Sequence, residues 1–166
     1  MATTYEAIAT VTVGSGGAAS MAFSSIPQTY TDLLIKISAR TTNGSDDAFY
    51  VRFNGSTTSY TGKRLYGTGS GTGSDSPDYF GTVVYDGQTA NTFGSAEVYV
   101  PNYTSSNYKS ASTDAVQENN ATFAVSTLVA SLWSNTSAIT SISITALSAT
   151  NFKQYSTATL YGIKNS

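Results

Sequence analysis

The sequence of 166 residues contains no cysteine and no histidine. The lack of cysteine excludes disulfide frameworks and thiolate nucleophiles. The lack of histidine excludes Ser-His-Asp triads and the usual zinc ligand sets. The most common chemistries of hydrolases and zinc sites therefore cannot be built from this chain.

Charge is also scarce, because only 11% of the residues are charged and the formal net charge is −2. Eight lysines and arginines offer no basic patch for a phosphate backbone, so we expect no nucleic-acid partner. No segment approaches the roughly 18 apolar residues of a membrane-spanning helix. The first residues lack the basic and apolar regions of a signal peptide. We therefore expect neither a membrane span nor a signal peptide.

Serine and threonine are abundant, with 51 of the 166 residues, and twelve tyrosines stand against one tryptophan. The chain is 40% hydrophobic, which argues against disorder. Valine, isoleucine, threonine and aromatic residues occur along its whole length, and these residues fit a pleated, half-buried surface. The composition therefore favours an ordered, β-rich domain.

Apolar and polar side chains alternate in many short segments, most clearly where Leu33, Ile35 and Ile37 share an inward face and Lys36 and Arg40 are expected on the opposite, outward face. The segment 122–133 fits the helical period as well, but its threonine, valine and phenylalanine residues and the lack of an N-cap favour a strand. Short strands separated by turns predict an all-β fold, a jelly-roll-like antiparallel β-sandwich of about 8–10 strands. We expect a single domain spanning residues 1–166.

Two connecting segments carry strong local signals. Asn54-Gly55 predicts a β-hairpin, because both central positions of a type I′ turn need a positive φ. Residues 67–78 are rich in glycine and serine and have no apolar side chain, which predicts a solvated loop. The glycines of this loop do not form a phosphate-binding motif, since a proline and a strand follow them in place of a helix.

The carboxylates form no recognisable catalytic or metal-binding motif. Asp46 and Asp47 lie in one turn and Asp75 and Asp78 in another, and such clusters can hold calcium, but aspartate is also common in turns for local hydrogen bonding. The sequence does not decide whether calcium binds. A glycosidase needs two carboxylates that flank the bond it cleaves, and two of the acidic residues of this chain could meet in the fold to form such a pair. Sugar-cleaving domains of this class usually carry several tryptophans that stack on the sugar, however, and this chain has only one. We expect no enzyme and name no catalytic, cofactor-binding or metal-binding residue.

Tyrosine is the strongest candidate for function. Its side chain supplies a large contact area and a hydrogen-bonding tip, and it is enriched at interfaces. The same side chain stacks on sugars. We expect seven tyrosines at strand ends or on outward faces: Tyr30, Tyr50, Tyr66, Tyr79, Tyr99, Tyr103 and Tyr108.

Eight strings, in this order, resemble a family of small proteins encoded by tailed bacteriophages, many of them from aquatic environments. They are Phe23–Leu34, Val51–Gly55, Arg64–Gly67, Ala90–Gly94, Val100–Ser105, Ala138–Ile142, Asn151–Phe152 and Ala158–Ile163. The resemblance covers essentially the whole chain. It implies a virion structural protein with a jelly-roll β-sandwich and carries no catalytic motif. The segment Asn151–Tyr155 departs from the family, whose members have a Gly- and Ala-rich turn there.

The resemblance implies a capsid-decorating (cement) protein that binds and stabilises the head shell, assembled in the host cytoplasm and located in the virion. Its expected partners are the major capsid protein or other virion proteins. Capsid symmetry favours a homotrimer. The expected contacts with other subunits or the capsid lie at Thr3, Thr4, Tyr5, Tyr66, Tyr79 and Tyr103.

The alternative is a tail-fibre module that binds a receptor or a surface glycan. It predicts a concave, tyrosine-lined face with residues 67–78 at its mouth, next to Tyr66 and Tyr79. The sequence has no coiled-coil or fibre repeat that would act as a shaft, which favours the capsid.

Overall fold

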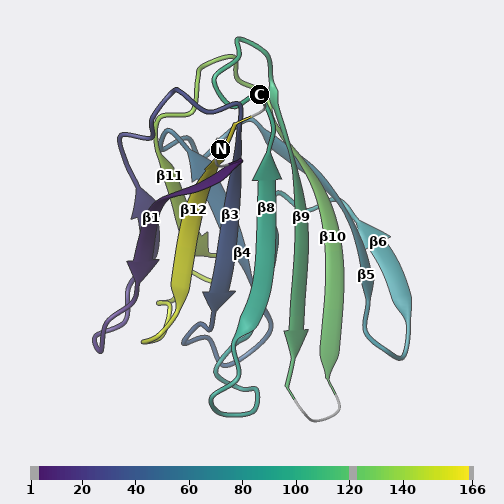
Figure 1. Ribbon diagram of the computed structural model, residues 1–166. Coiled ribbons are helices and arrows are strands. Elements are labelled where there is room, and N and C mark those ends of the chain that lie inside the picture. The colour runs from purple at the N-terminus through teal and green to yellow at the C-terminus, as the bar shows by residue number, and fades with distance from the viewer. Residues whose placement is uncertain (1–3, 120–122, 165–166) are drawn as a thin grey trace.

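The computed structural model describes residues 4–119 and 123–164. In these residues the chain forms twelve strands and no helix, arranged as two antiparallel sheets that pack together (Figure 1). The prediction of an all-β sandwich is confirmed, although the strands outnumber the 8–10 expected. The described part of the chain also contains no helix that could cross a membrane.

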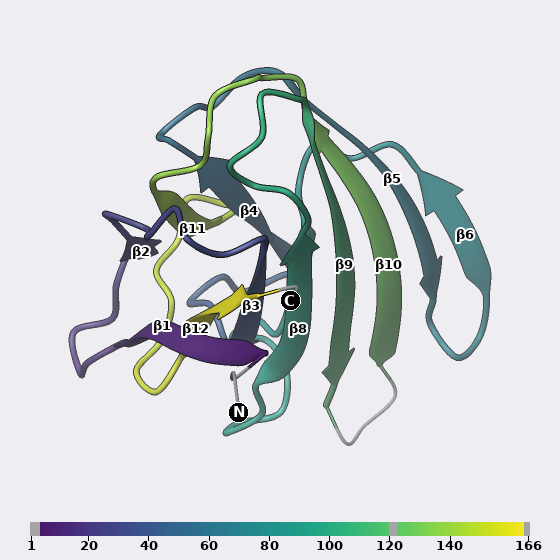
Figure 2. The ribbon, with the colours of Figure 1, turned by 45° about the horizontal axis from the view of Figure 1, so that its top comes forward.

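One sheet has eight strands and the other has four. The large sheet consists, in spatial order, of β1 (Tyr5–Thr12), β12 (Thr157–Ile163), β3 (Asp32–Ala39), β8 (Gly94–Val100), β9 (Lys109–Glu118), β10 (Ala124–Trp133), β5 (Tyr60–Gly67) and β6 (Thr72–Asp75). The small sheet consists of β2 (Ser20–Phe23), β11 (Ile142–Ala146), β4 (Asp47–Phe53) and β7 (Gly81–Val83). Figure 2 shows β5 and β6 extending beyond the small sheet, so the two layers do not match in width.

The strands pair in the nested manner of a jelly roll. β1 pairs with β12 in the large sheet, and β2 pairs with β11 in the small sheet. β3 then pairs with β8 and β4 with β7, again in alternate sheets. Such nesting brings early and late segments of the chain together at both ends of the sandwich.

The core lies between the sheets and follows the predicted alternation. Leu33, Ile35 and Ile37 are buried in β3. In β10, Val129 and Trp133 are buried whereas Leu128 is exposed, as a strand requires. The interpretation of residues 122–133 as a strand is therefore confirmed for the part that the structure describes.

The turn at Asn54-Gly55 has the predicted backbone, with φ angles of 52° and 70°, but the hairpin prediction is wrong. β4 already lies between β11 and β7, so it has no free edge for β5, which belongs to the large sheet. The Asn54 side chain instead ties the turn to the start of β11. Its Nδ2 donates to the Ala138 carbonyl, and its Oδ1 accepts a hydrogen bond from the amide of Thr140.

The loop prediction for residues 67–78 is wrong for Thr72–Asp75, which form β6 and pair with β5. Residues 68–71 make the turn between them. This strand needs no apolar side chain of its own because its neighbour covers it. The Tyr66 ring lies against Gly73, where a Cβ atom would approach the ring to 2.5 Å.

Gln117 is an unusual buried residue on the inner face of β9. Neither its Oε1 nor its Nε2 has a hydrogen-bond partner in the described chain. Because such an amide loses its hydration without compensation, Gln117→Met is expected to raise the free energy of unfolding by about 1–2 kcal/mol. Urea denaturation measures this change. The exposed Gln154→Met serves as the control, with an expected change within about 0.5 kcal/mol, and a loss of stability in Gln117→Met would contradict the prediction.

Candidate functional site

The eight-stranded sheet has one face that the small sheet does not cover, which we call the outer face. One row of cross-strand neighbours runs over all eight strands of this face. The row consists of Ser74, Leu65, Leu128, Asp114, Glu97, Lys36, Thr159 and Thr10. Most of the row is uncharged, and its lysine pairs with a neighbouring glutamate at 2.8 Å between Nζ and Oε1. This hydrogen bond raises the pKa of Lys36.

A group of tyrosines lies on the outer face beside this row. Tyr99, Leu34 and Tyr161 are neighbours on β8, β3 and β12. Tyr5, Leu34 and Tyr161 line a shallow hollow of about 390 Å³ together with the Lys36–Glu97 pair. The Tyr99 hydroxyl donates to Oδ2 of the buried Asp32, and burial together with this hydrogen bond raises the pKa of Tyr99. Its ring is therefore held in place on the surface.

Leucines mark the opposite side of the outer face. Leu65 and Leu128 are cross-strand neighbours and remain 62% and 57% exposed. They line a second hollow of about 580 Å³ between β5, β6 and β10. Val116 of β9 adds a further exposed apolar side chain. Adjacent exposed apolar residues of this kind are typical of interaction surfaces.

Tyr66 and Tyr79 come together in the structure, but around Arg64 and not on the outer face. The Arg64 guanidinium lies 4.4 Å from the centre of the Tyr66 ring and 5.3 Å from that of Tyr79. Asp75 binds the same guanidinium through both carboxylate oxygens. Both tyrosines therefore pack around Arg64 at the β5–β6 hairpin, and Tyr66 also lines the hollow between β5, β6 and β10.

The remaining predicted contact residues divide into three cases. Tyr5 is exposed on the edge strand β1, and Thr4 before it is exposed as well. Thr3 lies outside the described residues. Tyr103 lies just after the end of β8, but the expected contact through its side chain is wrong, because this side chain is completely buried and its hydroxyl donates to the carbonyl of Pro27.

Two of the four turn aspartates bind groups of the chain itself. Asp47 accepts hydrogen bonds from the Ala48 amide and the Ser148 hydroxyl, and Asp75 pairs with Arg64. The residues that the structure describes contain no group of three or more acidic side chains arranged to hold a metal ion. Glu97 and Asp114 are opposite one another on β8 and β9, but on the open outer face and not in a cleft.

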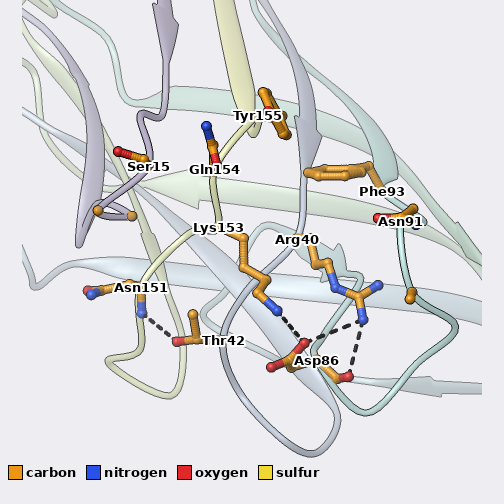
Figure 3. Close-up of a pocket in the computed structure, with 13 residues that line it drawn as sticks. Ser15, Arg40, Thr42, Asp86, Asn91, Phe93, Asn151, Lys153, Gln154 and Tyr155 are labelled. Atoms are coloured by element: carbon orange, nitrogen blue, oxygen red, sulfur yellow. Dashed lines mark hydrogen bonds and ion pairs between the residues drawn. The ribbon is translucent and has the colours of Figure 1, made fainter.

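Sequence reasoning missed a hollow at one end of the sandwich, which we call the loop-end hollow. It lies between four connecting segments and has a volume of about 420 Å³ (Figure 3). Its floor contains Arg40, expected to point outward beside Lys36 but in fact 4% exposed. The guanidinium donates to the carbonyls of Asp86 and Gln88 and to those of Thr89 and Thr92. No sequence motif marks such a site, because these partners are backbone atoms.

Asp86 joins the two cations of the loop-end hollow. Its Oδ1 accepts a hydrogen bond from Lys153 and lies 3.6 Å from Nη2 of Arg40. The hydrogen bond from Lys153 lowers the pKa of Asp86, and the charge of Arg40 acts in the same direction. The carboxylate is therefore ionised at neutral pH, and it ties the β7–β8 connection to the segment before β12.

Comparison with known proteins found no matching family model, no matching curated protein and no matching solved structure. A β-sandwich by itself does not specify a function, because this architecture carries many unrelated activities. The surfaces described above are therefore the basis for a functional proposal.

Proposed function

We propose that this chain is a structural protein of a bacteriophage virion that decorates the capsid and stabilises the head shell. The proposal combines the ordered resemblance in the sequence with one structural observation, the uncovered outer face of the eight-stranded sheet. Attachment through this face to the major capsid protein, or to another virion protein, is the function that the geometry supports best.

The chemistry of the outer face suits burial against a partner. Tyr99 and Leu128 supply aromatic and aliphatic contact area of the kind enriched in the centre of interfaces. The charged pair Lys36–Glu97 is already matched, so burial would leave neither charge without a partner. The serines and threonines between them offer hydrogen bonds while losing little side-chain entropy. Asp114, the other charged residue of the row, lies between Glu97 and Leu128, so the partner would have to supply a donor or a cation for it.

We also propose that β1 mediates contacts between copies, as a homotrimer requires. β1 is an edge strand of the large sheet, and most of its residues are exposed. Edge strands present unpaired backbone groups that can pair with another chain. A register shift between Ala7 and Ala9 divides this edge into two short segments, and we place the contact at the first, next to Thr4 and Tyr5. A closed ring of three copies uses one such contact repeatedly.

Leu128→Lys tests the outer face as the attachment surface. A lysine here places a charge in the centre of the proposed contact, so we expect the variant to bind at least about tenfold more weakly. The measurement is co-sedimentation of the purified chain with assembled shells of the major capsid protein encoded in the same genome. Leu128 is 57% exposed, so folding does not depend on it.

Leu147→Lys is the matched control, because Leu147 is an exposed leucine that follows β11 of the small sheet. It should bind the shells like the unmodified chain. Failure of the unmodified chain to sediment with the shells would overturn the capsid role. Equal binding of both lysine variants would instead move the contact away from the outer face.

A further inference from the structure

The loop-end hollow is built from segments far apart in the sequence. The β1–β2 connection contributes Gly16 and Gly17, and the β7–β8 connection contributes Asn91 and Phe93. The segment before β12 adds its residues from the opposite side. The volume of about 420 Å³ lies within the range of small-ligand sites, roughly 300–1,000 Å³. The hollow is separate from the outer face, because none of its lining residues belongs to that face.

Two aromatic rings line this hollow. Phe93 is half-buried, whereas Tyr155 is 69% exposed, the highest value among the large exposed hydrophobic side chains. Figure 3 shows both rings on one side of the hollow, with the charged group of Arg40, Asp86 and Lys153 on the other. Aromatic faces beside polar groups provide a platform for a ligand that has one apolar side and many hydroxyls.

The backbone of Tyr155 is strained, with a φ of 72°. A bulky aromatic residue rarely adopts this left-handed conformation, which suits glycine or asparagine and costs about 1 kcal/mol or more. The surrounding chain enforces it, since the Tyr155 amide donates to the Val13 carbonyl and the Ser156 amide donates to that of Lys153. The fold thus holds an exposed aromatic ring over the hollow at a site where glycine would relieve strain.

Polar groups without protein partners surround the rings. The side chains of Asn91, Asn151 and Gln154 line the hollow and make no hydrogen bond within the described chain. Oδ2 of Asp86 likewise has no partner among the described residues, since Lys153 and Arg40 both use Oδ1. Three amides and a carboxylate oxygen are donors and acceptors that match hydroxyl groups.

The charged side chains of the hollow already have partners within the protein, which argues for an uncharged ligand. Both terminal nitrogens of Arg40 donate to backbone carbonyls, so no donor pair faces an anion. Lys153 binds the Asp86 carboxylate. An anionic ligand would have to break these contacts, whereas a neutral one would only use the remaining amides and Oδ2.

We propose that the loop-end hollow is a binding site for a neutral saccharide, with a pyranose ring stacked on Tyr155. Phe93 forms the inner wall, and the side-chain amides and Asp86 bind the hydroxyls. The site goes beyond attachment to the capsid, because it lies at one end of the sandwich, shares no lining residue with the hollows of the outer face, and would give the decorated particle a contact with surface polysaccharide.

The experiment uses a glycan array of neutral oligosaccharides of glucose, galactose, mannose and N-acetylglucosamine, followed by calorimetric titration of the strongest responder. Tyr155→Gly removes the ring and also relieves the strained backbone. We expect at least about tenfold weaker binding, with a thermal unfolding midpoint equal to or above that of the unmodified chain. A purely structural role of Tyr155 would instead lower the midpoint.

Three controls sharpen this test. Tyr155→Phe keeps the ring and should bind within about threefold of the unmodified chain. Tyr108→Gly removes another exposed tyrosine at the far end of the sandwich and should leave binding unchanged. Leu128→Lys should still bind the glycan while losing the capsid, so the two proposals fail independently. A blank array, binding only to acidic glycans, or full binding by Tyr155→Gly would each overturn the inference.

Discussion

Arg40→Met is expected to lower the free energy of unfolding by about 3–5 kcal/mol, the range for breaking a buried charged network. Arg40 is almost completely buried, and its guanidinium donates to four backbone carbonyls of the segment between β7 and β8. Methionine keeps the apolar stem of the side chain but donates to none of these oxygens. Buried acceptors that lose their donor have no compensation. Urea denaturation followed by far-UV circular dichroism measures the loss.

Arg52→Met is the matched control for this substitution. Arg52 stacks on Tyr50 with 3.8 Å between the guanidinium and the ring centre, but its Nη1 is buried without a hydrogen-bond partner in the described chain. The control removes the cation–π contacts with Tyr50 and Tyr60 and no carbonyl network, so its expected cost is about 1 kcal/mol. Equal losses of unfolding free energy in the two variants would show that the hydrogen bonds from Arg40 to the four carbonyls add nothing to stability. Arg40→Met should also weaken saccharide binding, because Asp86 and Asn91 belong to the segment that Arg40 holds.

The strands could be predicted from the sequence where one face of a segment is buried. The period of two in Leu33, Ile35 and Ile37 reports this burial directly, and the same holds for β10. The sheet to which a strand belongs could not be predicted in this way. Asn54-Gly55 forms the predicted turn, but pairing also requires a free edge, and β11 and β7 occupy both edges of β4.

β6 escaped prediction for a different reason. Thr72–Asp75 have no apolar side chain, so no alternation marks them as a strand. Their stability comes from β5, whose Tyr66 covers Gly73 and whose Arg64 binds Asp75. Sequence patterns describe a segment by its own side chains, whereas the cover for this strand is supplied by a neighbour.

For the surfaces, the sequence predicted the type of side chain, tyrosine, but for the most part not which tyrosines lie there. Tyrosines lie on the outer face, but of the six expected contact residues only Tyr5 and Tyr66 are among the described residues that line its two hollows. Tyr161 and Tyr155 were missed as candidates. The sequence pattern does not show that Tyr155 lies at a positive φ, a conformation that tyrosine rarely adopts. Arg40 continues the polar face of β3 in sequence, yet the chain turns it inward after the strand ends at Ala39.

Trp133→Ala is expected to cost about 3–5 kcal/mol, which corresponds to a fall of roughly 10 °C in Tm for a domain of this size. Trp133 is 1% exposed and belongs to an aromatic cluster between the sheets. Its ring centre is 5.6 Å from that of Phe53 and 6.2 Å from that of Tyr60, which it stacks on. Alanine leaves a cavity that these rigid rings cannot fill, because both are fixed by further contacts with Phe80.

The chain has a single tryptophan, so the variant also loses its fluorescence probe and unfolding must be followed by far-UV circular dichroism. Trp133→Phe should cost clearly less, because Nε1 has no hydrogen-bond partner in the described residues and a phenyl ring keeps part of the contacts. Leu132→Ala, on the outer side of the same strand, should cost less than about 1 kcal/mol. A Trp133→Ala variant as stable as Leu132→Ala would mean that the aromatic cluster does not hold the two sheets together. The partly covered large sheet would then depend on the aliphatic residues of β3 and β8 for its attachment to the small sheet.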